Sequence, residues 1–400
     1  MDSQEMASLS SGSSALTWAD RARALRPLIE AAAPRIEAAR ELTDDVLNAL
    51  HEARLFRLLI PASAGGEEAD PVSFVEMIEA IAMADASTAW CLGQGSGSSM
   101  IAAYLPHDAA WHIFGEDSRA VLAWGAGAVG QAHVTDGGYR VSGTWQFASG
   151  IRHATWLGGH CRIIERDGSL RTDPDGKPVE RTMLFPKTSA HTADVWQVMG
   201  LRGTGSDTYS VKDLFVPEDF SATRDAPDDR RCAGPLYSLS TNQMFAASFA
   251  AVALGVSRAI LDAFETLART KSPREIKQTL RDNAAVQCEV GLAEARIGAA
   301  RSYLLESLRN AWDWVQRGEP ITMAHRIRIR LASTYAIHEA REVAARIYHE
   351  AGATAIFEGQ PFERRLRDIN TISQQVQGRR AHFETGGQFY LGLTPVSAFL

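Results

Sequence analysis

The spacing of apolar residues changes twice along this chain, and no other feature constrains the fold as strongly. Over residues 16–118 and again over residues 231–400, apolar residues recur at the spacing that is typical of amphipathic helices. Over residues 119–230 the period shifts towards two, and Gly-Gly at 137–138 and Asp-Gly at 167–168 are hairpin signals. This order predicts an α+β protein with an N-terminal α-helical domain, a central β-barrel-like domain and a C-terminal four-helix bundle.

The composition excludes several classes of partner. The chain has 400 residues, 45% of them hydrophobic, which is enough for two or three domains. A formal net charge of −7 argues against nucleic acid, because nucleic-acid binding depends on Lys and Arg that neutralise phosphates. The four cysteines are widely spaced and indicate reduced thiols in the cytoplasm. No apolar run has the length of a membrane span, and the Ser-rich residues 1–15 predict a disordered leader.

A glycine-rich run at 125–130 matches the GxGxxG pattern of dinucleotide-binding folds. That pattern binds a pyrophosphate only when it follows a strand and opens a helix. Here residues 131–139 lead into the Gly-Gly hairpin and a further strand, so a helix is not expected. We therefore interpret the run as a flexible glycine loop, where a backbone can approach a ligand closely.

Two short motifs stand out within the β-patterned segment. The first is Trp-Gln-Phe-Ala-Ser-Gly at 145–150, and the second is Gly-Leu-Arg-Gly-Thr-Gly-Ser at 200–206. A strand that ends in Ala-Ser-Gly offers hydroxyl and amide groups, while the aromatic residues before it offer an apolar wall. Each motif also has a purely structural explanation, since a Trp-x-Phe strand can fill a barrel core and a glycine run can form a turn.

These motifs resemble the acyl-CoA dehydrogenase superfamily when they are taken with the helical flanks, Val-Pro at 216–217 and Arg-Arg-Leu-Arg-Asp-Ile-Asn-Thr at 364–371. More narrowly, they resemble its flavin-dependent, two-component (group D) monooxygenase branch. The resemblance covers roughly residues 16–395.

The resemblance implies an activity and an assembly. In this branch a separate reductase supplies reduced flavin, either FAD or FMN, which reacts with molecular oxygen to give a C4a-hydroperoxyflavin. That species hydroxylates a small aromatic substrate. The resemblance also implies a homotetramer, arranged as a dimer of dimers, in which each subunit helps to hold the flavin of its neighbour.

The resemblance also assigns roles by position. Ser149 corresponds to the serine beside the reactive edge of the flavin and is a catalytic candidate. The cofactor-binding candidates are Trp145, Phe147, Ala148, Ser149, Gly150, Thr204 and Ser206, together with Arg281 and Gln287, which would reach the flavin of a neighbouring subunit. The substrate-binding candidates are Trp90, Ser98, Gly127 and Gln375, and two of these, Ser98 and Gln375, are also catalytic candidates.

Two departures from the family pattern bear on the substrate. The superfamily's dehydrogenases commonly have a catalytic glutamate where this chain has Gln-Gln-Val-Gln-Gly at 374–378, and glutamine cannot accept a proton. The phenol hydroxylases of the oxygenase branch have histidines at the positions of Ser98 and Gln375. Because both histidines are missing, we expect an indole-like or other electron-rich heteroaromatic substrate rather than a phenol that needs a base.

Two alternatives stay open at this point. The chain could be an acyl-CoA dehydrogenase whose base lies on another helix, in which case it would hold oxidised FAD tightly and bleach on addition of an acyl-CoA. It could also be a non-catalytic binding member of the fold, which failure to bind any flavin would favour. The histidines show no spacing such as HExxH, so we expect no metal site.

Overall fold

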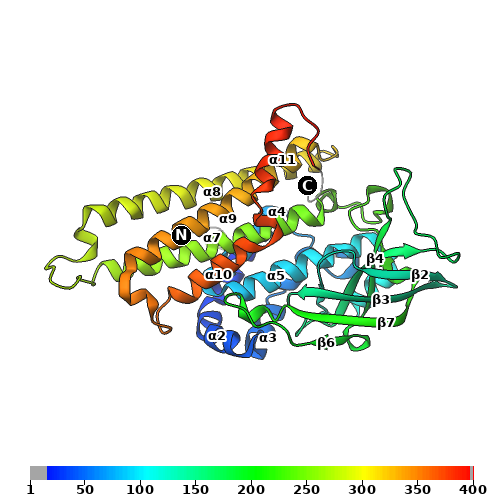
Figure 1. Cartoon of the computed structure of the whole chain (residues 1–400), viewed down its shortest axis with the longest axis horizontal. Coiled ribbons are helices and arrows are strands. Elements are labelled where there is room, and N and C mark those ends of the chain that lie inside the picture. Colours follow the sequence, from blue (N-terminus) through cyan, green and yellow to red (C-terminus); the bar gives the residue numbers. More distant parts are fainter. Residues whose placement is uncertain (1–15, 397–399) are drawn as a thin grey trace, which may run out of the picture.

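The computed structural model describes residues 16–396 and 400, so the predicted leader over residues 1–15 lies outside the described residues. The chain forms helices, then a sheet, then helices again, which confirms the predicted α+β class (Figure 1). The first helical region ends at Gly115, the strands run from Leu122 to Ala222, and long helices resume at Thr241. The predicted domain limits at 118 and 230 fall within the two stretches where the structure changes type.

Between residues 16 and 115 the structure contains six α-helices, and short 3-10 and π turns connect them to the sheet. The helices are α1 (Trp18–Ala24), α2 (Arg26–Ala39), α3 (Asp44–Glu52), α4 (Pro71–Ala84), α5 (Ala86–Ser99) and α6 (His107–Ala110). Aspartates start the two that matter most for the site: Asp70 accepts hydrogen bonds from two backbone N–H groups of α4, and Asp85 accepts one from Thr88 N of α5 at 2.8 Å. These caps fix where α4 and α5 begin.

The central region is one mixed sheet of eight strands. They are β1 (Leu122–Trp124), β2 (Gly130–Thr135), β3 (Gly138–Ala148), β4 (Trp156–Ile164), β5 (Glu180–Pro186), β6 (His191–Ala193), β7 (Asp207–Pro217) and β8 (Ser221–Ala222). The order is β6-β7-β3-β2-β4-β5-β8, with β1 paired to β4. No ladder joins β6 to β8 within residues 16–396, so the predicted barrel is open.

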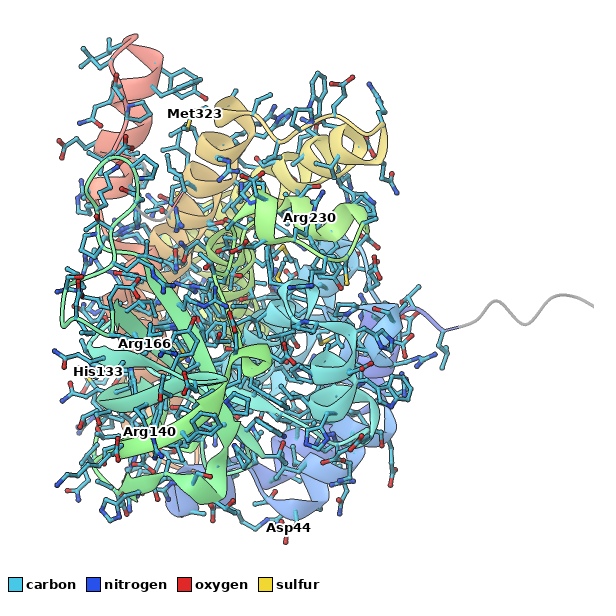
Figure 2. All side chains as sticks on the ribbon, turned by 90° about the vertical axis from the view of Figure 1, so that its right-hand side faces the viewer. Asp44, His133, Arg140, Arg166, Arg230 and Met323 are labelled. Carbon is cyan, nitrogen blue, oxygen red and sulfur yellow. The ribbon has the colours of Figure 1, made fainter. Side chains whose placement is uncertain are left out.

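Alternation along the strands separates an outer face from a core. His133 and Arg140 are cross-strand partners that point outwards, as Figure 2 shows, whereas their neighbours Ala132 and Val141 are buried. The largest core side chain is Trp145, which stacks on Tyr209 with ring centroids 5.3 Å apart. Glycines 130, 143 and 159 surround its indole, and a Cβ at any of them would overlap the ring. The sheet therefore has a tryptophan-centred core.

The C-terminal region is built from α7 (Thr241–Ala268), α8 (Ala284–Gln316), α9 (Met323–Ala351) and α10 (Glu363–Gln374), with α11 (Ala381–Tyr390) beyond them (Figure 1). By length and composition α7 could cross a membrane, but 94% of its apolar window is buried inside the protein. It contacts α4, α5, α8, α9 and α10. We conclude that α7 is the central core helix that joins the N-terminal helices to the bundle.

Candidate active site

Four of the predicted site residues form one chain of hydrogen bonds, which we call the hydroxyl chain. The indole Nε1 of Trp90 donates to Ser149 Oγ at 3.0 Å, and Ser149 Oγ lies 2.8 Å from Ser206 Oγ. Ser206 Oγ lies 2.7 Å from Thr204 Oγ1, which donates to the Leu201 carbonyl at 2.8 Å. The four side chains are buried. The structure thus unites residues from three separate parts of the sequence.

The direction of each hydrogen bond follows from the two ends of the hydroxyl chain. Trp90 Nε1 can only donate, and a carbonyl can only accept. A hydroxyl has one proton, and Thr204 gives its proton to Leu201. Ser206 must therefore donate to Thr204, and Ser149 must donate to Ser206. Ser149 Oγ also accepts from Trp90, so it is set to accept one further hydrogen bond rather than to donate one.

Leu201, at the end of the hydroxyl chain, has a left-handed backbone with a φ of 52°. Its N–H donates to Asp368 Oδ1 of α10 at 2.7 Å, and its carbonyl also accepts from Trp196 Nε1 at 3.0 Å. Burial, and secondly the charge of Asp85, raise the pKa of the Asp368 carboxyl to about 7. The side chains of Thr204, Trp196 and Asp368 thus hold the strained Leu201 in place. Of these, Asp368 ties the loop at the end of the hydroxyl chain to α10.

A β-bulge directs Trp145 and Phe147, which the sequence predicted to form one apolar surface, to different sides of the strand. The register between β3 and β7 shifts between Trp145 and Ala148, and Phe147 takes a φ of 63°. The Phe147 side chain is 60% exposed and meets Trp196 edge to face, with centroids 6.2 Å apart. Trp145 is fully buried and donates to the His160 carbonyl at 3.0 Å. The structure thus places Trp145 in the sheet core and leaves Phe147 open to a ligand, so the contact of Trp145 with flavin stays a prediction.

The other predicted residues of the β region lie at the edges of this arrangement. Ala148 is buried, and Gly150 follows in a turn with a φ of 78°, its N–H donating to the Thr204 carbonyl at 2.9 Å. Gly127 is exposed in the loop between β1 and β2. Strands flank that loop on both sides, so the GxGxxG run opens no helix and is no dinucleotide fingerprint.

Three predicted residues lie apart from the hydroxyl chain. Gln375 Oε1 accepts from Gln377 N at 2.7 Å, which caps its own turn after α10. Arg281 and Gln287 are exposed and contact each other, because Gln287 Nε2 donates to the Arg281 carbonyl at 2.9 Å. Figure 1 shows the start of α8 at the end of the bundle farthest from the sheet. Within one protomer neither residue reaches Ser149.

A row of stacked rings that sequence reasoning missed extends from Trp90 towards the sheet. Trp90 stacks on Phe249 with centroids 3.9 Å apart, Phe249 stacks on Phe245 at 5.7 Å, and Phe245 meets Trp124 edge to face at 6.2 Å. We call these four side chains the aromatic row. Phe245 and Phe249 fit the helical period of a core helix, and Trp124 fits a buried strand, so only the stacking reveals a common surface.

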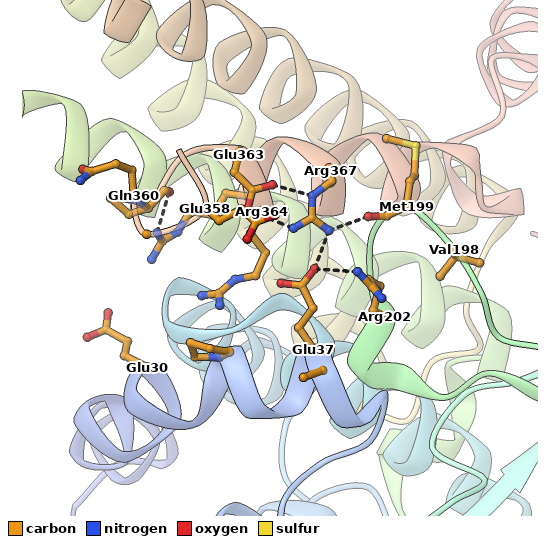
Figure 3. Close-up of a pocket in the computed structure, with 15 residues that line it drawn as sticks. Glu30, Glu37, Val198, Met199, Arg202, Glu358, Gln360, Glu363, Arg364 and Arg367 are labelled. Atoms are coloured by element: carbon orange, nitrogen blue, oxygen red, sulfur yellow. Dashed lines mark hydrogen bonds and ion pairs between the residues drawn. The ribbon is translucent and has the colours of Figure 1, made fainter. Parts of the chain in front are cut away.

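A charged surface pocket of about 910 Å³ lies elsewhere, between α2, α10 and the segment before Leu201 (Figure 3). Arg367 holds it together by donating to Glu363 and Glu37, each at 2.6 Å, and to the Met199 carbonyl at 2.7 Å. None of the predicted site residues lines this pocket. Its ion pairs join α2 and α10 to the loop that ends at Leu201.

The hydroxyl chain and Phe147 together fit a flavin. An isoalloxazine ring needs an apolar cover for its face and a polar partner for its N5 edge. The exposed ring of Phe147 can supply the cover, and the remaining lone pair of Ser149 can supply the partner. The positive φ of Phe147 and the bulge are the kind of strained backbone that clusters at ligand sites.

Comparison with known proteins bears on the family. The family description "Acyl-CoA dehydrogenase, N-terminal domain" matches residues 20–107, and "Acyl-CoA dehydrogenase, C-terminal domain" matches residues 247–378. The chain is 30% identical over 387 residues to the flavin-dependent monooxygenase oxygenase subunit HsaA of Rhodococcus jostii (strain RHA1), covering 94% of this chain and 98% of that protein.

Two further relatives also match nine-tenths or more of the chain. An indole-3-acetate monooxygenase of Pseudomonas putida is 29% identical over 364 residues, with 90% of each chain covered. XiaF from a Streptomyces species, solved in complex with FADH2 and glycerol, superposes with a TM-score of 0.86 at 26% identity and covers 95% of this chain and 96% of that one. The chain therefore belongs to the acyl-CoA dehydrogenase superfamily, in its flavin-dependent monooxygenase branch.

Proposed function

We propose that this chain is the oxygenase component of a two-component system and hydroxylates a small aromatic or heteroaromatic substrate. The observation that supports this best is the direction of the hydroxyl chain, which leaves Ser149 Oγ as an acceptor. Reduced flavin has a proton on N5, whereas oxidised flavin has none. A hydroxyl that is set to accept therefore favours the reduced form, as an enzyme that receives flavin from a separate reductase requires.

The side chains have distinct tasks in this proposal. When bound, the flavin supplies the activation of oxygen; one oxygen atom enters the product, the other leaves as water, and the flavin is oxidised. Ser149 holds the N5 edge, and Phe147 covers the ring face. The buried aromatic row keeps water away from the substrate ring.

The two positions at which the phenol hydroxylases carry a histidine hold no base in this chain, which supports an electron-rich heteroaromatic ring. Ser98 is neutral, and Gln375 is an amide engaged in capping its own turn. An indole needs no deprotonation before it attacks an electrophilic oxygen, whereas a phenol benefits from a base. The similarity to an indole-3-acetate monooxygenase agrees with this substrate class.

The dehydrogenase alternative has little support in this geometry. Residues 374–378 contain no carboxylate, so they offer no base for removal of a proton beside a thioester. The carboxylate of α10 that comes closest before these residues in the sequence, Asp368, is buried and accepts a hydrogen bond from Leu201 N–H. It therefore holds the loop at Leu201.

A second copy of the chain completes the proposed flavin site in a homotetramer. Arg281 and Gln287 are exposed at the start of α8, which lies at the end of the bundle farthest from the sheet, where a partner's flavin could reach them. The adjoining surface of α8 exposes Cys288 and Leu292, and open space lies above Gly291 and Gly298. Small residues along one face let a second helix approach closely, which supports packing of α8 against another subunit.

The test is anaerobic titration of the purified protein with reduced and oxidised FAD and FMN, followed by indole and isotopically labelled oxygen. We expect tighter binding of reduced than of oxidised flavin, and one labelled oxygen atom in the product. Tight binding of oxidised FAD that bleaches with an acyl-CoA, without any labelled product, would contradict the proposal. Light scattering on the same sample measures the number of subunits.

A further inference from the structure

Arg224 is a half-buried cation at the far end of the aromatic row. Its guanidinium carbon lies 5.5 Å from the centre of the Trp124 ring. Across the described part of the chain, Arg224 has no ion pair or hydrogen bond, and the neighbouring Asp225 is engaged with Thr241 instead. Arg367, another half-buried arginine, is by contrast paired with two glutamates. No group of the described chain pairs with this guanidinium, so an anionic ligand can do so.

Ser98 lies on the side of α5 that faces the join between Phe245 and Trp124. Gly97 packs against Phe245 of α7, while Gly95 packs against the segment that leads into β1. Successive helical residues are about 100° apart, so Ser98 falls between these two faces. Its Oγ is fully buried and has no hydrogen-bond partner among residues 16–396 and 400. Ser98 is therefore a second polar group that the protein leaves unpaired.

Gln94 marks where this side of α5 becomes accessible. It lies one helical turn before Ser98, on the same side of the helix. Every residue of α5 except Gln94 is buried. The side that carries Trp90, Gln94 and Ser98 thus runs from the hydroxyl chain, past a point open to solvent, towards Trp124 and Arg224.

We infer that Arg224 binds the carboxylate of the substrate, which is then an aromatic or heteroaromatic carboxylic acid whose ring lies along the aromatic row. This inference rests on the proposed function for the chemistry at the ring. The planar guanidinium matches a carboxylate with two parallel hydrogen bonds. The cation–π contact with Trp124 holds the guanidinium at the end of the aromatic row, and its N–H groups have no acceptor among the described residues.

A histidine, His160, also contacts Trp124 and is uncharged. His160 meets Trp124 at 4.9 Å, and burial, followed by the charge of Arg224, lowers the pKa of its imidazole. His160 Nδ1 lies 2.8 Å from Thr182 Oγ1, which holds the neutral ring in place. Neutral His160 neither repels Arg224 nor competes for the acid. The unpaired Ser98 Oγ is suited to a polar atom of the ring.

The experiment compares indole-3-acetate with neutral 3-methylindole. Equilibrium binding of each compound is measured by calorimetry, and product formation with reduced flavin and oxygen is measured in parallel. We expect Arg224→Gln to weaken binding of indole-3-acetate roughly 10- to 100-fold and to leave 3-methylindole within about twofold. Arg224→Lys keeps the positive charge but cannot donate two parallel hydrogen bonds. Its affinity for indole-3-acetate is expected to lie between those of the wild type and Arg224→Gln.

Arg231→Gln is the matched control, because Arg231 is an exposed arginine of the same loop. It is expected to bind both compounds as the wild type does. Equal affinity of wild type and Arg224→Gln for indole-3-acetate, or an equal loss in Arg231→Gln, overturns the inference. If indole-3-acetate binds through Arg224 but no labelled product forms with either compound, the proposed function fails and the inference stands. If only 3-methylindole is hydroxylated and the acid does not bind, the inference fails and the proposed function stands.

Discussion

The two ends of the proposed site differ in how completely their polar groups are paired. At the Ser149 end, each hydroxyl of the hydroxyl chain both donates and accepts. At the Arg224 end, Arg224 and Ser98 have no hydrogen-bond partner within the described residues. A paired network is rigid before any ligand arrives, whereas unpaired groups cost folding free energy until a ligand pairs them. We infer that the Ser149 end holds one group in one orientation and that the substrate completes the Arg224 end.

The largest expected effect concerns the carboxylate that anchors the paired end. Asp368 has a pKa of about 7 in the folded protein, above its ordinary value of 3.8, so the folded state binds the proton more tightly. The free energy of unfolding should therefore fall as pH rises from about 4 to about 7, by as much as about 1.4 kcal/mol per pH unit. Asp368→Asn keeps an acceptor for Leu201 N–H but cannot ionise. In denaturant titrations, its free energy of unfolding should therefore change little between about pH 4 and about pH 7. The same loss of pH dependence in exposed Asp108→Asn would contradict the assignment.

Removal of the hydroxyl at the centre of the paired end should affect chemistry more than stability. Ser149→Ala leaves Trp90 and Ser206 without their partner and removes the acceptor for the flavin edge. We expect roughly 100-fold less hydroxylated product per reduced flavin, with hydrogen peroxide formed instead. Product and peroxide are measured together. Ser142→Ala, on the outer face of the same strand, serves as control, and wild-type coupling in Ser149→Ala would refute the role of Ser149.

Reversal of the direction of the hydroxyl chain is expected to have a moderate effect. Thr204→Val has nearly the same shape but cannot donate to Leu201, so Ser206 and Ser149 become free to rotate. The preference for reduced over oxidised flavin should fall about tenfold, which corresponds to about 1.4 kcal/mol. Thr204→Ser should restore it. An unchanged ratio of the two dissociation constants in Thr204→Val would show that the direction is unimportant.

The smallest expected effects are those of substituting the two aromatic residues of the 145–150 motif, which should differ in kind. Phe147→Ala should weaken flavin binding several-fold and change the free energy of unfolding by less than about 0.5 kcal/mol, because the ring is exposed. Trp145→Phe should do the reverse, with about 1–3 kcal/mol of lost stability from the core and an unchanged flavin affinity. Thermal unfolding and flavin titration distinguish these outcomes. A loss of flavin affinity in Trp145→Phe but not in Phe147→Ala would show that Trp145, rather than Phe147, contacts the flavin.

Several parts of the fold and site could be predicted because short-range patterns encode them. The change of apolar period predicted the order of helices and strands. The two glycine- and serine-containing motifs identified Ser149, Thr204 and Ser206, and a position in the first helical region identified Trp90. The structure places these four residues in one network. The aromatic row was missed because its members also satisfy the periodicity of an ordinary core.

The sequence by itself determined the class of the fold, the family resemblance and the set of residues that bring hydroxyl groups to the site. The tertiary structure alone decided which way those groups face. A one-residue bulge turns Phe147 outwards while Trp145 stays inside, and a carbonyl at Leu201 sets the direction of three hydroxyl protons. It also decided that the Asp225 carboxylate binds Thr241 and that, among the described residues, no carboxylate pairs with Arg224. Such facts depend on strand register and on side-chain directions across distant elements, which local composition does not specify.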